Sequence, residues 1–521
     1  MITPPTNDFG SVRSVAGSID LGRISSSHHC LTTRTDTLRS ISMMSKQSMN
    51  NEHDKNSSRI IEEKNCNESI GRNSGTNKIL TSEWEGPTGE RDSLERLCSV
   101  SLRACEIMTP LVSGIYQQLL VLSKPKNYSN TTGTDNTRSD KKGLVQKVKQ
   151  DNSAFTIADG MVQRLLINVL FSHALFRDIV GEEDDGDDDD DVETDATSQE
   201  WWYQVQGLSI PEDLQSLVDS TRVQIESLAT EYLKNERDGH HPYQHLTVFI
   251  DPIDGTREFS TGKGEQCSIC IGFANEHGNA VAGVVYRPLT HPMPTWVAGA
   301  KCEGYAVSEF YGKDPMVGVS AIGKEQGGLL TSNGAISPFV ESLLTEMQLP
   351  RIKSGGAGNK MMLLLDNSIQ NCETNDNIGT QDSMLYIQDR GVSRWDTCAA
   401  EACLDAFGGR LLKLTEFLDS NDKHVNETGD GHETKMLYTY LASKTNLDFV
   451  SGSANLTKYN SALDNEQLQT DQKAVRVEQV KPYANLCGLV AFGKEWNTPE
   501  RRQILHRAIV RAAKMNSPSF D

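Results

Sequence analysis

The 521-residue sequence has no run of about 18 apolar residues, the length that suggests a membrane-spanning helix. Its first residues also lack the apolar stretch of a secretory signal peptide. Basic residues are in deficit, with 51 Lys and Arg against 71 Asp and Glu and a net charge of −20. Because phosphate backbones attract basic surfaces, this balance argues against a nucleic acid polymer as a partner. We predict no membrane partner either.

The acidity is unevenly distributed along the chain. Eleven acids and no basic residue lie between Glu182 and Asp195, and removing these eleven from the net charge of −20 leaves −9. A net charge of that size is ordinary for a soluble protein. The one glycine in this run, Gly186, is misplaced for the twelve-residue calcium loop of an EF-hand. We therefore predict a solvated, disordered insertion at about 184–200.

Cysteine spacing gives no sign of a disulfide framework. The eleven cysteines are odd in number and scattered. Cys267 and Cys270 have the spacing of redox and zinc motifs, but no second pair or histidine cluster completes a metal site. Their neighbours at 269–273 resemble a strand, so we predict buried cysteines. The pattern indicates a reducing compartment, and we expect the cytoplasm.

Apolar residues are also scarce, at 37% with a mean hydropathy of −0.47. Values this low indicate that part of the chain is disordered. Residues 1–90 are rich in Ser, Thr, Asn, Arg and Gly without lasting periodicity, so we predict a disordered tail. The first fifty residues hold 16 Ser or Thr and three acids, which also resembles a transit peptide. A plastid or mitochondrion is therefore the alternative location.

Periodicity locates several elements in the remaining sequence. Apolar residues at helical spacing predict helices at 211–235, 338–347 and 499–514. Apolar runs predict strands at 246–250, 268–273, 280–286, 410–414 and 486–492, and the turn residues at 275–279 predict a hairpin. Residues 418–478 are polar and interrupted, and we predict an insertion there.

Two carboxylates follow the apolar strand at 246–250. Asp251 and Asp254 are three residues apart, and Gly255 and Thr256 come directly after them. Glycine permits a close approach of the backbone to a ligand, and free N–H groups at the start of the next segment can bind an anion. Carboxylates beside an anion site repel phosphate unless cations lie between them. Mg²⁺ prefers oxygen ligands and shares them with phosphate, so the segment predicts a magnesium and phosphate site.

Two other interpretations of this segment are weaker. Capping aspartates at a strand-to-helix turn would explain Asp251 and Asp254 but not the Gly-Thr that follows. A second class of phosphatase forms a covalent aspartyl intermediate with acids two residues apart. Here the acids are three residues apart, which favours direct attack by water.

Residues 251–259 resemble the hallmark of the lithium-sensitive, metal-dependent phosphatases of the inositol monophosphatase superfamily. Two further signatures of that family occur in the expected order, an acidic turn at 181–184 and a second aspartate motif at 395–400. The resemblance covers about residues 95–415 and resumes at 485–492. It implies an enzyme, a phosphoric monoester hydrolase, with an α/β (α+β) fold.

The implied architecture is a layered αβαβα sandwich. Residues 91–320 would form an α+β half with an antiparallel sheet, and 321–521 an α/β half with a mixed sheet. The active site would lie between the halves. Relatives occur as monomers and homodimers, so both states stay open.

The resemblance also implies a ligand set for two or three Mg²⁺ ions. Glu182, Asp251 and the carbonyl of Ile253 would hold the first ion. Asp251 would bridge to a second ion held by Asp254 and Asp396. A third ion would bind near Glu182.

The implied catalytic pair is Asp159 and Thr256, which would relay the proton of the attacking water. Asp159 lies in a Thr-Ile-Ala-Asp segment that matches the family pattern. Alone it could equally cap a helix.

The substrate is a small phosphorylated metabolite, and two branches of the family compete. Residues 257–259 and the glycine-rich loop ending at Lys360 resemble the bisphosphate nucleotidases, with Lys360 available for a second phosphate. Gly255, Thr256, Ser337 and Lys360 would bind the substrate. Ser337 matches their Ser-His-Ser segment, although the histidine is absent. This reading predicts removal of the 3'-phosphate of adenosine 3',5'-bisphosphate by metal-activated water.

The long gap between Glu182 and Asp251 and the insertion after Leu414 instead resemble inositol polyphosphate 1-phosphatase. That enzyme would act on inositol 1,4-bisphosphate. An inactive metal- or ligand-binding homologue is a third reading, but every expected carboxylate is present.

Overall fold

The computed structural model describes the following residues: 86–90, 92–123, 147–148, 154–183, 199–205, 208–234, 241–310, 327–366, 384–389, 392–419, 437–441, 484–485 and 487–519. All of them belong to one compact unit, Ser82–Asp521. Nearly all of the predicted tail, the acidic insertion up to residue 198 and most of the 418–478 insertion lie outside the described residues.

A six-stranded sheet forms the first β layer. Its strands, in spatial order, are β10 (Tyr305–Glu309), β9 (Thr295–Ala300), β8 (Ala280–Arg287), β7 (Ser268–Ala274), β6 (Thr247–Asp254) and β3 (Asp178–Gly181). The sheet is antiparallel as predicted, except that β3 runs parallel to β6. A parallel pair requires a long crossover, and the chain between these strands includes helices α3 (Gln199–Tyr203) and α4 (Glu212–Tyr232).

A five-stranded mixed sheet forms the second β layer. Its strands, in spatial order, are β12 (Arg351–Lys353), β11 (Gly328–Thr331), β13 (Met384–Gln388), β17 (Leu489–Phe492) and β15 (Arg410–Lys413). Short pairs join β1 (Lys147–Val148) to β2 (Ala154–Phe155), β4 (Gln204–Val205) to β5 (Leu208–Ser209), and β14 (Val392–Ser393) to β16 (Ala484–Asn485).

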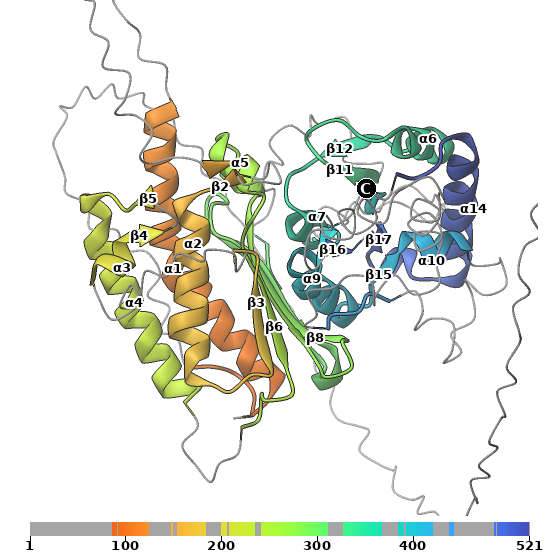
Figure 1. Cartoon of the computed structure of the whole chain (residues 1–521). Coiled ribbons are helices and arrows are strands. Elements are labelled where there is room, and N and C mark those ends of the chain that lie inside the picture. Colours follow the sequence, from red (N-terminus) through yellow and green to blue (C-terminus); the bar gives the residue numbers. More distant parts are fainter. Residues whose placement is uncertain are drawn as a thin grey trace, which may run out of the picture. The chain divides into compact units, whose positions relative to one another are not determined.

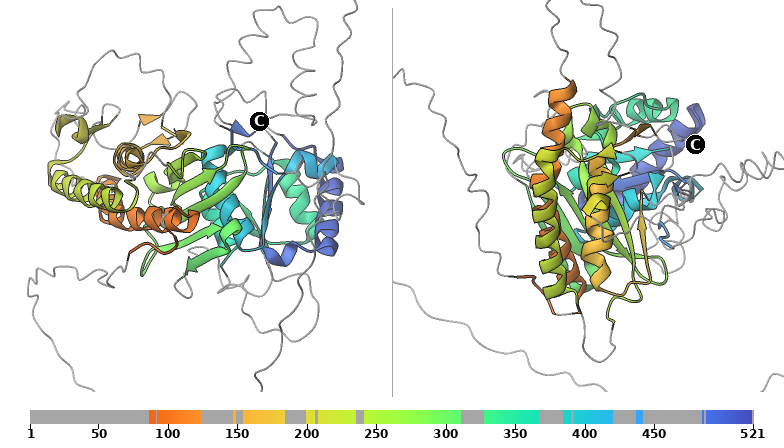
Figure 2. Two further views of the ribbon diagram at one scale, coloured as in Figure 1. Left: turned by 90° about the horizontal axis from the view of Figure 1, so that it is seen from below. Right: turned by 60° about the vertical axis from the view of Figure 1, so that its left-hand side comes forward.

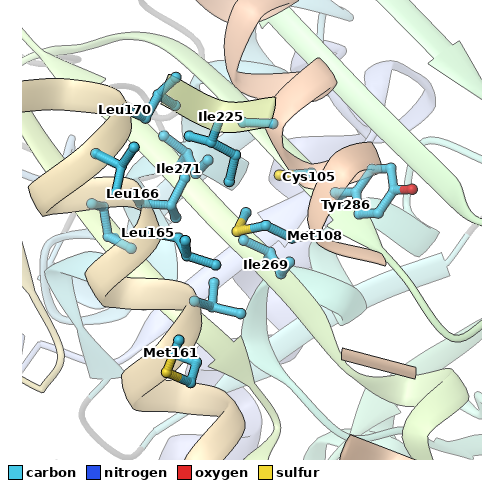
Figure 3. Packing of buried hydrophobic residues seen from close by; sticks show 14 of the residues in the cluster. Cys105, Met108, Met161, Leu165, Leu166, Leu170, Ile225, Ile269, Ile271 and Tyr286 are labelled. Carbon is cyan, nitrogen blue, oxygen red and sulfur yellow. The ribbon is translucent and has the colours of Figure 1, made fainter. Parts of the chain in front are cut away.

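Helices cover the outer face of the six-stranded sheet. They are α1 (Leu94–Ser123), α4 and α2 (Ile157–Arg164), which continues as the π-helix η1 (Leu165–Leu170). Met108, Leu165 and Ile225 from these helices form one buried cluster with Ile269 and Ile271 of β7 (Figure 3). Because side chains alternate across a strand, Cys270 between them belongs to the cluster on the opposite face.

The middle layer consists of α7 (Ala357–Leu363) and α9 (Arg394–Ala406), which share a buried cluster with both sheets. Helix α9 lies close to the first sheet because glycines face it. A Cβ at Gly272 or Gly283 would lie within 2.5 Å of backbone atoms of Ala399. The outer helices α6 (Pro338–Met347), α10 (Leu414–Asp419) and α14 (Pro499–Met515) cover the far face of the second sheet. The order of layers is the predicted αβαβα sandwich (Figures 1 and 2).

Most predicted elements are confirmed within a few residues. Helix α6 matches the prediction at 338–347, and β7 and β8 form the predicted hairpin. The strand predicted at 246–250 is longer, because β6 continues through Asp254. Cys267 and Cys270 are free and buried. None of the helices in the described ranges has the length and apolar character needed to cross a bilayer.

One part of the region predicted as an insertion is packed into the protein. Residues 437–441, here called the strap, bury Tyr438 and Tyr440 to 2% and 0% exposure. The Tyr440 hydroxyl donates a hydrogen bond to Glu401 on α9, and the Tyr438 hydroxyl donates to the Gly488 carbonyl. The polar character of residues 418–478 gave no sign of this packing, because the buried surface comes from two aromatic rings.

The Glu401 carboxyl makes stability depend on pH. Burial raises its pKa from 4.5 to about 8, although the Tyr440 hydrogen bond opposes the rise. Between these values the folded protein keeps a proton that the unfolded chain has lost, so the free energy of unfolding falls as pH rises. Glu401→Gln should remove this loss. In urea unfolding, the free energy of unfolding of Glu401→Gln relative to wild type should be higher at pH 8 than at pH 5. Glu341→Gln, at an exposed position, is the control and should show no such change. Equal pH dependence in wild type and Glu401→Gln would contradict the assignment.

Candidate metal centre

The parallel pairing of β3 and β6 brings two acidic residues together. The register pairs Gly181 with Ile250, so Glu182 and Asp251 follow neighbouring strand positions. The Glu182 N–H donates to the Ile250 carbonyl at 3.1 Å. Because the carboxyl ends of parallel strands meet at one edge, both acids reach the same edge of the sheet.

A break in register brings Asp254 into the same group. Asp251 pairs with Cys270 but Asp254 pairs with Ser268, so three steps along β6 match two along β7. In a regular strand, residues three apart point to opposite faces. The extra residue acts as a β-bulge, which re-aims side chains and is common beside functional sites.

Asp396 reaches the group from α9. It occupies the third position of the helix, and its carboxylate accepts a hydrogen bond from the Ser393 N–H at 2.5 Å in a capping box. This contact fixes the carboxylate at the helix N-terminus, where partial positive charge favours an anion.

The three aspartates fit a cation. Oxygens of Asp251, Asp254 and Asp396 all lie within 4.8 Å of one another. Oδ1 of Asp251 is buried and has no hydrogen-bond partner among the described residues. A buried carboxylate oxygen in that state is costly unless a cation compensates it, so this donor set suits Mg²⁺.

Crowding of negative charge is visible in the pKa values of this group. Burial, with Glu182, Asp254 and Asp396 nearby, raises the pKa of Asp251 well above its usual value. Burial, with Glu182 and Asp254 nearby, raises the pKa of Asp396 to about 7. Without a cation these charges repel one another, which again favours a metal at this position.

The glycine-rich loop holds Asp254. Its carboxylate accepts hydrogen bonds from the N–H groups of Ala357 at 2.6 Å and Asn359 at 3.0 Å. A Cβ at Gly356, which has φ +62°, would lie 2.4 Å from the Asp254 carboxylate. Glycine is therefore required for this close approach. The loop fixes the Asp254 carboxylate as well as bordering the cavity described below.

Asp159 and Thr256 meet as the sequence predicts. Oγ1 of Thr256 lies 3.0 Å from both Oδ1 of Asp159 and the carbonyl of Ile253. The other Asp159 oxygen accepts from the Thr156 N–H at 2.9 Å. Burial raises the pKa of Asp159 to about 7. Asp159 is thus both a helix cap and the partner of Thr256.

A cavity of about 380 Å³ lies beside the glycine-rich loop, whose Gly356 contacts the Asp254 carboxylate on one side and lines the cavity. Its lining includes Ser337, Lys360, Tyr386 and Gly356. Lys360 is 4% exposed and its Nζ lies 4.9 Å from the centre of the Tyr386 ring. Burial lowers its pKa although Asp254 favours the charged form. Ser337 caps α6 by accepting from the Val340 N–H at 3.3 Å.

Residues that the sequence analysis missed support this arrangement. Ser268 donates to Asp254 at 2.7 Å. The Gln266 amide oxygen accepts from the Gly355 N–H at 2.8 Å and from Asn333 at 2.7 Å. No local pattern marks these polar residues, because their partners lie far away in sequence. Gly255, with φ +91°, is the N-cap of helix α5 (Thr256–Ser260), so the next segment begins at Thr256 as predicted.

Comparison with known proteins gives concordant matches. A sequence profile described as the Inositol monophosphatase family matches residues 131–446. Human 3'(2'),5'-bisphosphate nucleotidase 1 is 29% identical over 209 residues, which cover 39% of this chain and 61% of the relative. The mouse Golgi-resident adenosine 3',5'-bisphosphate 3'-phosphatase is 29% identical, covering 38% of this chain and 48% of the relative. The chain thus spans less than two thirds of these relatives.

Zebrafish inositol monophosphatase 3 is 28% identical over 198 residues, covering 36% of this chain and 50% of the relative. Among solved structures, CysQ from Bacteroides thetaiotaomicron aligns with a TM-score of 0.26 and 16% identity. That alignment covers 40% of this chain and 77% of the CysQ chain.

Proposed function

The chain belongs to the inositol monophosphatase family, and from this premise we propose that it is a Mg²⁺-dependent phosphatase of small phosphorylated metabolites. The observation that carries the proposal is the convergence of Asp251, Asp254 and Asp396, with Asp254 held by a glycine-rich loop that also lines a cavity. Glu182 adjoins Asp251 through the strand register. These four carboxylates would form an oxygen-rich centre, with the cavity available for a substrate.

The carboxylates and the Ile253 carbonyl would hold two or three Mg²⁺ ions. When bound, Mg²⁺ would make water a better nucleophile and stabilise negative charge on the leaving oxygen. Thr256 would hold the attacking water at its hydroxyl and pass the proton to Oδ1 of Asp159, 3.0 Å away. Its alternative acceptor, the Ile253 carbonyl, would then be free to act as a ligand.

We propose adenosine 3',5'-bisphosphate as the substrate, with loss of its 3'-phosphate. Two relatives named for bisphosphate nucleotides, and the buried Lys360 in the cavity, support this choice. Lys360 would pair with the second phosphate as a point charge. Inositol 1,4-bisphosphate is the second candidate, favoured by the long interval between Glu182 and Asp251. Cytoplasmic location and a monomeric or homodimeric state stay predictions from the sequence.

The test compares phosphate release from adenosine 3',5'-bisphosphate and inositol 1,4-bisphosphate with Mg²⁺, with and without lithium. We expect kcat/KM for the nucleotide to be higher by at least about tenfold, equal to 1.4 kcal/mol. Lys360→Met should raise KM for the bisphosphate more than for adenosine 3'-monophosphate, which lacks the second phosphate. Preference for the inositol would support the second candidate, and release from neither would favour an inactive homologue.

A further inference from the structure

The strap, residues 437–441, contacts β6 and α9, the two elements that carry Asp251, Asp254 and Asp396. Its Tyr440 N–H donates to the carbonyl of Gly278 at 2.7 Å, in the turn between β7 and β8. The Tyr440 ring packs edge-on against Phe249, with centroids 5.9 Å apart. Phe249 precedes Asp251 by two residues on β6. The strap is therefore anchored to the sheet that positions Asp251.

The same segment holds the start of α9. Arg394, the first residue of that helix, is fully buried, and its Nη1 donates to the carbonyl of Leu441 at 2.7 Å. A buried guanidinium needs acceptors, so this bond constrains the first helical turn. Asp396 lies in that turn, two residues later. Tyr440 adds a second bond to the same helix at Glu401.

We propose that the strap sets the position of Asp396 relative to Asp251, and that Arg394 is a positioning residue for the metal centre. The inference rests on the proposed metal-dependent function. Metal ligands tolerate deviations of only about 0.2 Å in distance, so a small shift of α9 would weaken cation binding. A change in the strap would leave all three aspartates and all residues that line the cavity in place. The expected consequence is a change in metal affinity.

Two glycines offer a matched pair of variants. Gly278 and Gly304 both lie in turns before or after strands of the first sheet, with φ +77° and +69°. A Cβ at Gly278 would lie 2.8 Å from Cγ2 of Thr439 and 3.0 Å from Cγ of Leu441, both in the strap. A Cβ at Gly304 would meet nothing within 4 Å. Alanine strains the backbone at both positions but pushes the strap at only one.

The experiment measures Mn²⁺ binding to the full chain, by the loss of the free-ion signal in electron paramagnetic resonance. Gly278→Ala should raise the Kd by about tenfold, corresponding to 1.4 kcal/mol, while Gly304→Ala leaves it within about twofold. The midpoint temperature of thermal unfolding should fall by a similar amount in both variants. Arg394→Lys keeps the charge but loses the planar donor geometry, and should also raise the Kd.

The outcomes separate this inference from the proposed function. Equal Kd values for Gly278→Ala and Gly304→Ala would overturn the strap's role while leaving the metal centre intact. Wild-type protein that binds no Mn²⁺ would overturn the proposed function, and the inference with it, before any variant is compared. Should Gly278→Ala fail to fold, Arg394→Lys decides: a wild-type Kd in that variant would overturn the inference.

Discussion

Asp251→Asn should lower turnover by at least about a hundredfold, because metal coordination contributes several kcal/mol and each 1.36 kcal/mol is tenfold. Asn is isosteric, and Oδ1 of Asp251 has no hydrogen-bond partner to lose among the described residues. The substitution also removes one charge from the repelling group around Glu182 and Asp396. We therefore expect the metal-free variant to unfold at a higher denaturant concentration than metal-free wild type.

The measurements are Mg²⁺-dependent phosphate release and urea unfolding in a chelator. Asp178→Asn is a suitable control, because Asp178 is an exposed residue at the opposite end of the β3–β6 pair. It should leave turnover unchanged. Wild-type turnover in Asp251→Asn would refute the ligand assignment. A loss of turnover accompanied by a loss of stability would instead indicate a structural role.

Asp159→Asn should lower turnover by about 10² to 10⁴, the range for loss of a general base. The variant should fold, because an amide oxygen can still accept the hydrogen bond from the Thr156 N–H. The Mg²⁺ affinity should be unchanged, since Asp159 is not among the aspartates that converge. Steady-state kinetics checks the expected loss of turnover, and calorimetric titration with Mg²⁺ checks the unchanged affinity. A large loss of Mg²⁺ affinity would reassign Asp159 as a ligand.

A double-mutant cycle with Thr256→Val tests whether the two residues act as one unit. The 3.0 Å contact between Thr256 and Asp159 predicts strong coupling, so the double variant should lose little more than either single variant. If the loss of turnover in the double variant equalled the product of the two single losses, the residues would act independently, which would contradict the relay.

The candidate site was predictable because its residues lie in short motifs. Asp251, Asp254 and Thr256 share one segment, and the local chemistry of a strand end already indicates a cation and an anion there. Asp396 and Asp159 required the family resemblance, since each alone also fits a helix cap. The structure shows that both residues do cap their helices, so the structural and the functional interpretations are compatible.

Other features depend on contacts that no local pattern contains. The bulge between Asp251 and Asp254 is visible only in the pairing of β6 with β7. The hydrogen bonds from the glycine-rich loop to Asp254 join residues more than a hundred positions apart. The strap was hidden because its neighbours in sequence are polar, and only the packing of Tyr440 against Phe249 reveals it.

The most direct test of the account is phosphate release from adenosine 3',5'-bisphosphate by protein stripped of metal with a chelator. If the aspartate group holds the catalytic cation as proposed, the stripped protein should release no phosphate, and added Mg²⁺ should restore release in wild type but not in Asp251→Asn. Release at the full rate in excess chelator, or equal rescue of the variant, would contradict a metal centre at these aspartates.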